Sequence, residues 1–280
     1  MALVKVDTQV TDRGGRPIAR LAAPDFQVLD EGAPRPIVHF GYETEPLDLI
    51  LLLDVSGSMR RSLTELGNTA RAALTPLGPQ DRVAVILFAR ASEVREELTS
   101  DIAAVQAEIR DAVKADTLGS GTVINANIIA AARYAGRQPV RGRRAVLIVT
   151  DNQSLNYKVT DEDVVRELYA ADAVLYAILI GKHRRPDVPR STRPLNPDFT
   201  PSDVFKLAEQ TGGEAMESHQ AGSTFQQMVE RIRSRYSIAY EAPPATGGGF
   251  RHIRVALTGK AKKSHPDAVI RARAGYFAAK

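Results

Sequence analysis

The chain contains no cysteine among its 280 residues. This absence excludes disulfide bonds, thiolate metal sites and cysteine nucleophiles. It leaves the cellular compartment open, because exported proteins also fold without disulfides. Long apolar runs are missing as well: the longest, Ala173–Ile180, falls far short of the ~18 residues that a membrane-spanning helix needs. We therefore expect no membrane span in this chain, and we expect such short runs to form strands.

A strong charge of one sign is also absent, since the formal net charge is only +4. Nucleic-acid-binding proteins usually concentrate basic residues on one element, whereas Lys and Arg are spread along this chain apart from three short clusters. We interpret those clusters, Arg141–Arg144, His183–Arg185 and Lys260–Lys263, mainly as solvated loops. The composition that remains, 44% hydrophobic and 25% charged, is typical of a soluble globular protein, and we expect no nucleic-acid partner.

Both ends of the chain have the pattern of β-strands. Near the N-terminus, Val4, Val6, Thr8 and Val10 alternate with polar residues, which is typical of a half-buried strand. Short alternating segments recur on both sides of the middle region, separated by Gly and Pro turns and by a Lys-rich turn. These segments are Phe26–Leu29, Ile37–Phe40, Ser237–Glu241, Ile253–Leu257 and Val269–Ala274.

The middle of the chain alternates strands with helices. Leu49–Leu53 is a continuous apolar run, as expected of a strand buried on both faces of a parallel sheet. Further strands are predicted at Val83–Phe88, Val94–Leu98, Ala145–Thr150 and Ala173–Ile180, and helices at Ser62–Leu74, Ile102–Val113, Ile124–Tyr134, Asp161–Ala171, Ser202–Gln210 and Thr224–Arg235. This order predicts an α/β fold with a mainly parallel central sheet flanked by helices.

The two patterns together suggest a discontinuous architecture. We expect an α/β domain at residues 46–235, inserted in a β-sandwich-like domain built from residues 1–45 and 236–280. The alternative is two separate β extensions that pack on the α/β domain. Residues 183–200 hold four prolines and read as a long loop. That loop is either a solvated insertion or a specificity loop, whose arginines (184, 185, 190 and 193) would attract acidic partners.

Oxygen-bearing side chains follow the first buried strand. Asp54, Ser56 and Ser58 stand two residues apart in Asp54-Val55-Ser56-Gly57-Ser58, just before a predicted helix. Ligand sites in open α/β sheets lie beyond the carboxyl ends of the strands, and we expect Gly57 to allow the sharp turn that brings the three side chains together. Taken alone, the cluster would equally suit helix capping.

Two more oxygen donors are expected at the same edge of the sheet. Thr122 lies in a Gly-rich loop before a helix, and Asp151 directly follows the strand Ala145–Thr150. Three loops would then bring Asp54, Ser56, Ser58, Thr122 and Asp151 to one point. Hydroxyls and carboxylates are ligands for a hard cation, so the sequence predicts a site for Mg²⁺, or for Mn²⁺ or Ca²⁺.

These five residues resemble the metal-ion-dependent adhesion site (MIDAS) of von Willebrand factor A (VWFA) domains. Asp54, Ser56 and Ser58 match the Asp-x-Ser-x-Ser motif of that family, and Thr122 and Asp151 match the threonine and aspartate of its other two loops. Asn152 replaces the glycine often found after that aspartate. The resemblance covers about residues 46–235 and implies a doubly wound, Rossmann-like fold. It also implies that an acidic group of a protein partner completes the metal shell.

The outer segments resemble those of a bacterial, largely acidobacterial, group of VWFA-related proteins. The similarity rests on Asp25–Gly32, Thr211–Gly213, Tyr236–Tyr240 and Arg273–Phe277. Members of that group are commonly exported, so the resemblance implies an extracellular or periplasmic location. The N-terminus shows no basic region followed by an apolar core, so no signal peptide is visible and a cytoplasmic location stays open.

The sequence therefore predicts a metal-dependent adhesion or scaffold module rather than an enzyme. One alternative is a structural metal without an open coordination position, and another is a metal occupied by an acidic residue of the β region. A third is a Mg²⁺-dependent phosphotransferase of the haloacid dehalogenase type, which needs a second aspartate where this chain has Ser56. A serine is a poor proton donor at neutral pH, and no Gly-rich phosphate-binding loop is present.

Overall fold

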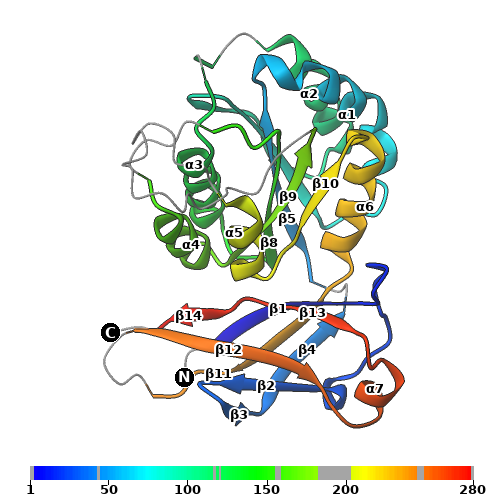
Figure 1. Ribbon diagram of the computed structural model, residues 1–280, viewed down its shortest axis with the longest axis vertical. Helices are drawn as coiled ribbons and strands as arrows, with labels where there is room; N and C mark the ends of the chain where they lie inside the picture. The colour runs from blue at the N-terminus through cyan, green and yellow to red at the C-terminus, as the bar shows by residue number, and fades with distance from the viewer. Residues whose placement is uncertain are drawn as a thin grey trace, which may run out of the picture.

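A six-stranded sheet forms the centre of the upper part of the molecule (Figure 1). The computed structural model describes residues 3–42, 45–115, 118–119, 121–154, 159–181, 203–244 and 249–278. The strand order is β10-β9-β8-β5-β6-β7, and all neighbours are parallel except β7, which pairs antiparallel with β6. The strands are β5 (Leu47–Asp54), β6 (Arg82–Phe88), β7 (Ser92–Thr99), β8 (Arg143–Thr150), β9 (Ala173–Ile180) and β10 (Ala215–Ser218).

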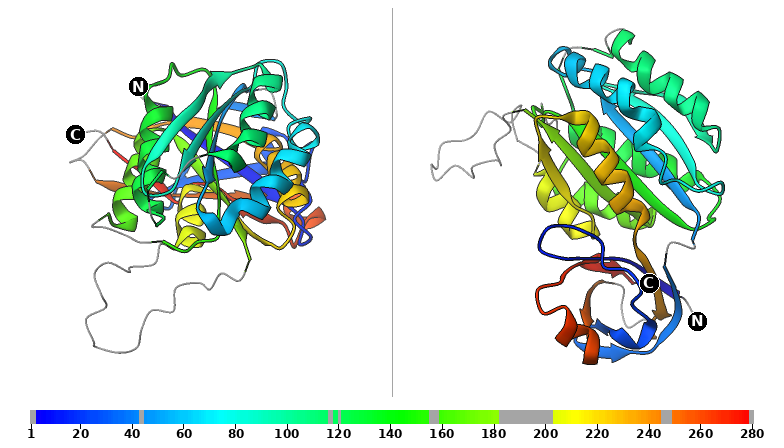
Figure 2. Two further views of the ribbon diagram at one scale, coloured as in Figure 1. Left: turned by 90° about the horizontal axis from the view of Figure 1, so that it is seen from above. Right: turned by 90° about the vertical axis from the view of Figure 1, so that its right-hand side faces the viewer.

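Three helices cover each face of this sheet (Figures 1 and 2). Helices α1 (Arg60–Ala73), α2 (Ile102–Asp111) and α6 (Ala221–Arg233) lie on one face, and α3 (Ile124–Arg137), α4 (Asp161–Ala170) and α5 (Val204–Thr211) on the other. Along β5, Leu49, Leu51 and Leu53 belong to the first core, and Ile50 and Leu52 to the second. A strand buried on both faces has no polar side to offer, which explains its continuous apolar run.

The two ends of the chain form two antiparallel four-stranded sheets below the α/β part. One sheet has the order β13-β1-β11-β4 and the other β14-β12-β2-β3, so each combines strands from both termini. The strands are β1 (Leu3–Thr11), β2 (Phe26–Asp30), β3 (Ala33–Arg35), β4 (Ile37–Tyr42), β11 (Tyr236–Glu241), β12 (Phe250–Leu257), β13 (Val269–Arg271) and β14 (Gly275–Phe277). Val6 and Ile238 of one sheet share a buried core with Val28 and Val255 of the other. The predicted α/β fold inserted in a β-sandwich is confirmed, and the exact domain boundaries remain our proposal.

Several predictions of local structure were wrong. The Lys-rich turn at Lys260–Lys263 is part of a short helix, α7 (Gly259–Ser264), whose Ala261 packs into the sandwich core. The expected single strand Val269–Ala274 is divided into β13 and β14, which pair with different sheets. Helix α6 ends at Arg233, two residues earlier than expected. Each of these errors lies at a point where the chain passes from one packing partner to another. The strand and helix propensities of the residues do not indicate such a point.

The interpretation of Arg141–Arg144 as a solvated loop was wrong for Arg143 and Arg144, whereas Arg141 is exposed and lies before the strand. Arg143 and Arg144 begin β8 and are only 7% exposed each. Arg143 donates to the carbonyls of Ile232 and Arg233 at the end of α6, both at 3.0 Å. Arg144 donates to the carbonyls of Gln138 and Ala171, the C-cap residues of α3 and α4. Cations stabilise helix C-termini, where the last carbonyls have no partner within the helix.

Arg235 joins the sandwich to the α/β part. Its side chain is fully buried, and it donates to the Tyr176 hydroxyl of β9 at 2.6 Å and to the Asp7 carbonyl of β1 at 2.7 Å. Its Nε lies 3.2 Å from the Asp7 carboxylate. A buried guanidinium is tolerated only with such partners, so Arg235 holds the two parts in one arrangement.

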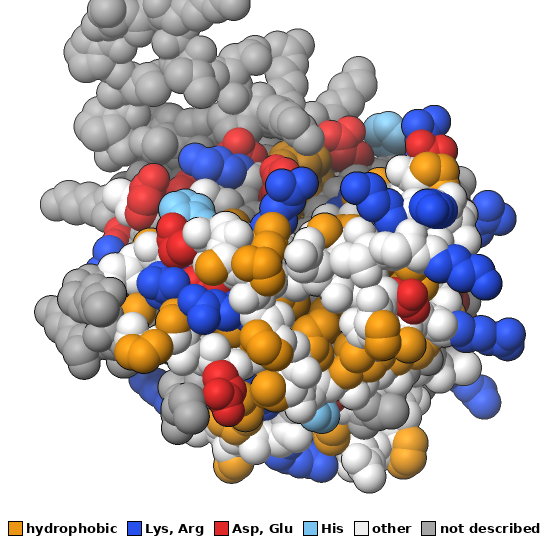
Figure 3. Space-filling view, turned by 90° about the horizontal axis from the view of Figure 1, so that it is seen from below, with side chains coloured by type: hydrophobic (Ala, Val, Ile, Leu, Met, Phe, Trp, Pro, Cys, Tyr) orange, Lys and Arg blue, Asp and Glu red, His pale blue; other side chains and the backbone are white. Residues whose placement is uncertain are grey.

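The lower face of the sandwich is mixed in character. Figure 3 shows hydrophobic side chains among polar ones on this face, with many Lys and Arg side chains around its margin. Among the described residues, no helix is both long enough and apolar enough to cross a membrane. The predicted loop 183–200, with its arginines and the His183–Arg185 cluster, lies outside the described residues.

Candidate metal centre

The upper edge of the central sheet, where the parallel strands end, carries the predicted site. Strands β5 and β8 are neighbours in parallel register, with Leu53 opposite Val149. Asp54 is the last residue of β5, and Asp151 directly follows β8. The two aspartates therefore leave adjacent strands at the same edge, which faces away from the sandwich (Figure 1).

Asp54 is completely buried and held from two sides. One carboxylate oxygen, Oδ2, accepts a hydrogen bond of 2.7 Å from the Thr150 hydroxyl on β8. The other, Oδ1, accepts from the Ser56 backbone N–H at 2.9 Å. These contacts fix the side chain before any ligand arrives, because both carboxylate oxygens already have a defined donor.

The first and third loops are joined by a chain of hydroxyls. The Ser56 and Ser58 hydroxyl oxygens lie 3.2 Å apart, and the Ser58 hydroxyl donates to Oδ2 of Asp151 at 2.6 Å. Asp151 Oδ1 in turn accepts from the Gln153 backbone N–H. The structure thus brings Asp54, Ser56, Ser58 and Asp151 together as the sequence predicted.

Gly57 has a different role from the expected one. It begins a 3₁₀ turn, η2 (Gly57–Met59), that leads into α1, and it does not adopt a positive φ. A Cβ added at Gly57 would meet no described atom within 4 Å. The turn therefore comes from 3₁₀ geometry rather than from left-handed glycine backbone, and the space above Gly57 is open.

Thr122 is placed at this edge through the backbone of its loop. The residue is 4% exposed and precedes α3. Ser154, three residues beyond Asp151, accepts from the Ile124 N–H at 3.1 Å and donates to the Thr122 carbonyl at 3.5 Å. The second loop is thus attached to the third, although among the described residues no hydrogen bond joins the Thr122 side chain to the hydroxyl chain above.

The electrostatics of the edge favour a cation. Burial raises the pKa of Asp54 above its usual value, and the nearby charge of Asp151 raises it further, against the hydrogen bonds from Thr150 and Ser56. Among the described residues, neither aspartate forms an ion pair with Lys, Arg or His within 4 Å. Two close carboxylates without a cation repel each other, and a bound cation would remove that repulsion.

The donor set fits a hard metal ion and not a soft one. Two carboxylates and three hydroxyls suit Mg²⁺, Mn²⁺ or Ca²⁺. Within the described part of the chain, no group of three or more His, Cys, Asp or Glu side chains is placed to hold a metal. Any metal at this edge would therefore depend on the serine and threonine hydroxyls as well as on the two aspartates.

Three residues that position the site were not identified from the sequence. Thr150 holds Asp54, and Ser154 joins the second loop to the third. Asn127 of α3 donates to the Val123 carbonyl at 2.7 Å and to the Ala89 carbonyl at 3.1 Å, which ties the second loop to the end of β6. The position of Thr150 directly before Asp151 was a sequence signal that could have identified it. The role of Asn127 depends on a residue 38 positions away.

Asn152 stands where the backbone requires an unusual conformation. Its φ is 59°, in the left-handed region that glycine adopts without strain and asparagine tolerates better than most residues. This explains how Asn152 can occupy a position that often holds glycine. Its amide oxygen Oδ1 is buried and has no hydrogen-bond partner among the described residues.

Comparison with known proteins identifies the α/β part. A family model described as the von Willebrand factor type A domain matches residues 49–153, which include Asp54, Ser56, Ser58, Thr122 and Asp151. The chain contains a von Willebrand factor type A domain. No curated protein sequence matches the chain.

Solved structures of the von Willebrand factor type A fold support this assignment. A von Willebrand factor type A structure from Catenulispora acidiphila superimposes with a TM-score of 0.51 at 13% identity, covering 90% of this chain and 73% of that one. The proximal thread matrix protein 1 of the mussel byssus, solved with a zinc-occupied MIDAS motif, gives a TM-score of 0.51 at 17% identity, covering 72% of this chain and 50% of that one. At such low identity, these similarities concern the fold.

Proposed function

We propose that this protein is a metal-dependent binding module, in which a divalent cation at the upper edge grips an acidic group of a protein partner. Asp54, Ser56, Ser58, Thr122 and Asp151 would hold the cation, which we expect to be Mg²⁺. The observation that carries the proposal is the 2.6 Å bond from Ser58 to Asp151, because it joins two loops that are distant in sequence and both oxygen-rich. The mussel protein, whose MIDAS motif holds zinc, supports metal binding in this fold.

The residues of the chain have separate tasks in this proposal. Thr150 and the Ser56 N–H orient the Asp54 carboxylate, and Ser58 orients Asp151. Ser58 is exposed and Ser56 half-buried, so the site opens to solvent above the sheet. A bound dication supplies an electrophilic centre that attracts a carboxylate. The open space above Gly57 leaves room for a partner side chain to approach.

An adhesion or scaffold role is favoured over catalysis. Von Willebrand factor type A domains are generally interaction modules without enzymatic activity. Serine at position 56 cannot act as the general acid that a phosphotransferase of the alternative class needs. The extracellular or periplasmic location expected from the sequence stays a prediction, as does the protein nature of the partner.

Water-proton relaxation with Mn²⁺ in place of Mg²⁺ tests the proposal and separates an open site from a closed structural one. An open Mn²⁺ site retains exchanging water, so binding to the protein should enhance the relaxation rate. A peptide that contains glutamate should then lower the rate by displacing that water, and the matched glutamine peptide should not. Bound Mn²⁺ without enhancement would instead indicate a closed structural metal.

Two variants complete the test. Asp54→Asn should abolish both Mn²⁺ binding and the effect of the peptide, because it removes a charge from the metal shell. Asp267→Asn is the matched control, since Asp267 lies on the sandwich surface in an exposed pair with Arg13. Unchanged Mn²⁺ binding in Asp54→Asn would refute the proposed site.

A further inference from the structure

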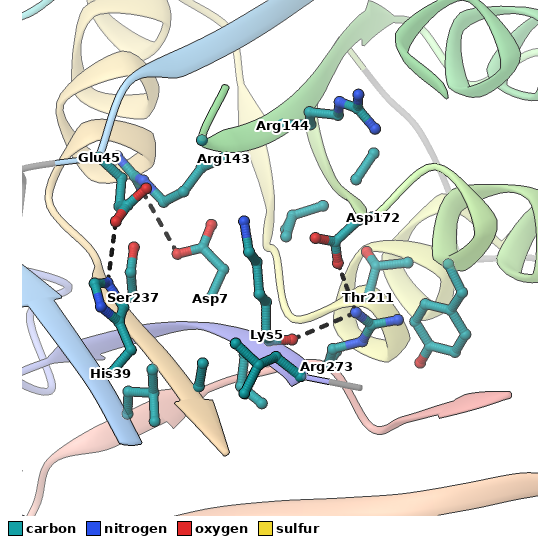
Figure 4. Close-up of a pocket in the computed structure, with 18 residues that line it drawn as sticks. Lys5, Asp7, His39, Glu45, Arg143, Arg144, Asp172, Thr211, Ser237 and Arg273 are labelled. Carbon is teal, nitrogen blue, oxygen red and sulfur yellow. Dashed lines mark hydrogen bonds and ion pairs between the residues drawn. The ribbon is translucent and has the colours of Figure 1, made fainter. Parts of the chain in front are cut away.

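A cavity lies at the opposite end of the central sheet from the candidate metal centre, between the sandwich and the start of the parallel strands (Figure 4). Its volume is about 280 Å³, near the lower end of the ~300–1,000 Å³ usual for small-molecule pockets. Such pockets occur preferentially where two parts of a protein meet. The metal centre is at the other edge of the same sheet, so this cavity is a separate feature.

The walls of the cavity come from both parts of the molecule. The sandwich contributes Leu3 of β1 and Ala239 of β11, which lie on the same face of the sheet as Lys5. The α/β part contributes Ala173 and Val174 from the start of β9. These aliphatic side chains form an apolar interior, which suits the hydrocarbon part of a ligand.

Each acidic group around the cavity already has a cationic partner or a histidine. Asp172 pairs with Arg273 at 2.7 Å, and Glu45 is bonded to His39 at 3.0 Å. Oδ1 of Asp7 lies 3.5 Å from Nη1 of Arg143 and 3.2 Å from Nε of Arg235. The carboxylates of Asp7 and Asp172 are therefore balanced by arginine side chains within the protein.

Lys5 is the exception among the charged groups that line the cavity. Its side chain rises from β1 into the cavity, with the ammonium between Asp7 and Asp172 in the view of Figure 4. No hydrogen bond or ion pair joins this ammonium to a described residue within 4 Å. Arg143, Arg144 and Arg273, by contrast, are committed to carbonyls or carboxylates of the protein. Lys5 therefore leaves one positive charge unbalanced beside an apolar interior.

We propose that this cavity binds a small monocarboxylate with an apolar body. The carboxylate would accept from the Lys5 ammonium, and the hydrocarbon part would lie against Val174 and Ala239. Small-ligand pockets usually recognise the charged group of the ligand at the mouth and bury its apolar part inside. Because its walls belong to both parts, an occupied cavity would stabilise the contact between the sandwich and the α/β domain.

Titration with sodium hexanoate, followed by NMR of the valine and alanine methyl groups, tests this proposal. Hexanoate should shift the resonances of Val174 and Ala239 in a saturable manner. 1-Hexanol and hexylamine have the same chain length without the negative charge, and each should bind about tenfold more weakly. Equal affinity for hexanoate and hexanol would overturn the assignment to a carboxylate.

The variant Lys5→Met isolates the contribution of the ammonium. Methionine keeps much of the aliphatic stem, and the exposed position of Lys5 makes unfolding of this variant no concern. Lys5→Met should weaken hexanoate binding about tenfold and leave hexanol binding unchanged. Lys262→Met on α7 is the matched control and should behave as the unaltered protein, because Lys262 is exposed and does not line the cavity. Unchanged hexanoate affinity in Lys5→Met would contradict the proposal.

A third variant and a metal-free control separate the cavity from the upper edge. Ala239→Leu adds side-chain volume at the wall and should abolish binding of both hexanoate and hexanol. Asp54→Asn should bind hexanoate like the unaltered protein, with or without Mg²⁺. Hexanoate binding that required Mg²⁺ and Asp54 would place the carboxylate at the metal centre and overturn the proposal for the cavity.

Discussion

Two buried aspartates, one in the sandwich and one at the upper edge of the α/β domain, behave in opposite ways. Asp30 and Asp54 are both 0% exposed, and burial alone would raise the pKa of each. For Asp30, hydrogen bonds from Arg251, Tyr240 and Tyr276 outweigh burial, and its pKa lies below the usual value. For Asp54, burial prevails and Asp151 adds to it, so its pKa lies above.

The difference separates a charge that serves the fold from one that, in our proposal, binds a cation. Asp30 has an Arg251 guanidinium nitrogen at 2.6 Å and the Tyr240 and Tyr276 hydroxyls at 2.9 and 3.0 Å. Asp54 has two neutral donors and a second carboxylate nearby. Folding has satisfied the first aspartate within the chain, whereas in our proposal the second gains a positive charge from a bound cation.

The largest effect is expected from Asp30→Asn. This substitution removes the negative charge that faces Arg251, which leaves a partly buried guanidinium without its partner. Loss of one member of such a pair should lower the free energy of unfolding by about 3–5 kcal/mol. Urea unfolding checks this value. Asp267→Asn, at an exposed pair, should stay within about 0.5 kcal/mol of the unaltered protein, and a similar small change in Asp30→Asn would contradict the comparison.

In the absence of metal, Asp54→Asn should change the free energy of unfolding in the opposite direction from Asp30→Asn. Because the folded-state pKa of Asp54 is raised, its charged form lowers stability above the usual pKa, and the neutral amide should leave metal-free stability equal or about 1 kcal/mol higher. With Mg²⁺ at a hundredfold excess over its Kd, only the unaltered protein should gain about 2.7 kcal/mol. Urea unfolding in EDTA and in Mg²⁺ measures both effects. A metal-free Asp54→Asn protein that is clearly less stable would break the contrast with Asp30.

Thr150→Val tests whether Asp54 is positioned by its neighbour strand. Valine keeps the shape of the side chain and removes the hydroxyl that donates to Asp54. Loss of a group that orients a ligand typically weakens metal binding about 10–100-fold. Calorimetric titration with Mn²⁺ measures the change. Thr64→Val on the exposed face of α1 should leave the affinity as it is. Equal affinities for the two variants would show that Thr150 does not position Asp54.

The smallest expected effect concerns the stability of the protein at acidic pH. A carboxyl whose folded pKa is depressed contributes stability above its unfolded pKa, and this contribution is lost as the pH falls through the folded pKa. Asp30 has such a depressed pKa, so the difference in stability between the unaltered protein and Asp30→Asn should shrink steadily below about pH 4. Urea unfolding at a series of acidic pH values follows this difference. A difference that is independent of pH would show that Asp30 acts without its charge.

Most of the α/β domain could be predicted because its signals are local. The apolar run Leu49–Leu53 predicts a strand buried on both faces, and the ends of β5 and β8 predict where Asp54 and Asp151 would meet. The five proposed ligands were found from motif and position together. The structure brings four of them into one hydrogen-bonded cluster and places Thr122 at the same edge through Ser154.

The rest depended on partners that are distant in sequence. From the sequence, Arg143 and Arg144 were predicted to lie in a basic loop. In the structure, their guanidinium groups donate hydrogen bonds to carbonyls at the ends of three helices. The Lys-rich segment after β12 resembled a turn, but Ala261 gains burial only against the folded sandwich. Composition cannot distinguish a solvated charge from a capping one, because the difference lies in which carbonyl stands within reach.

The sequence by itself determined the order of strands and helices, the doubly wound domain and the oxygen-rich loops, since periodicity and strand ends are properties of neighbouring residues. Only the tertiary structure decided which charges are satisfied. Asp30 meets Tyr240 and Arg251 across 210 and 221 residues, and Lys5 lines one cavity with the start of β9 only because the sandwich packs against the α/β domain. The pKa of a buried group and the walls of a cavity follow from such distant contacts, which no local pattern encodes.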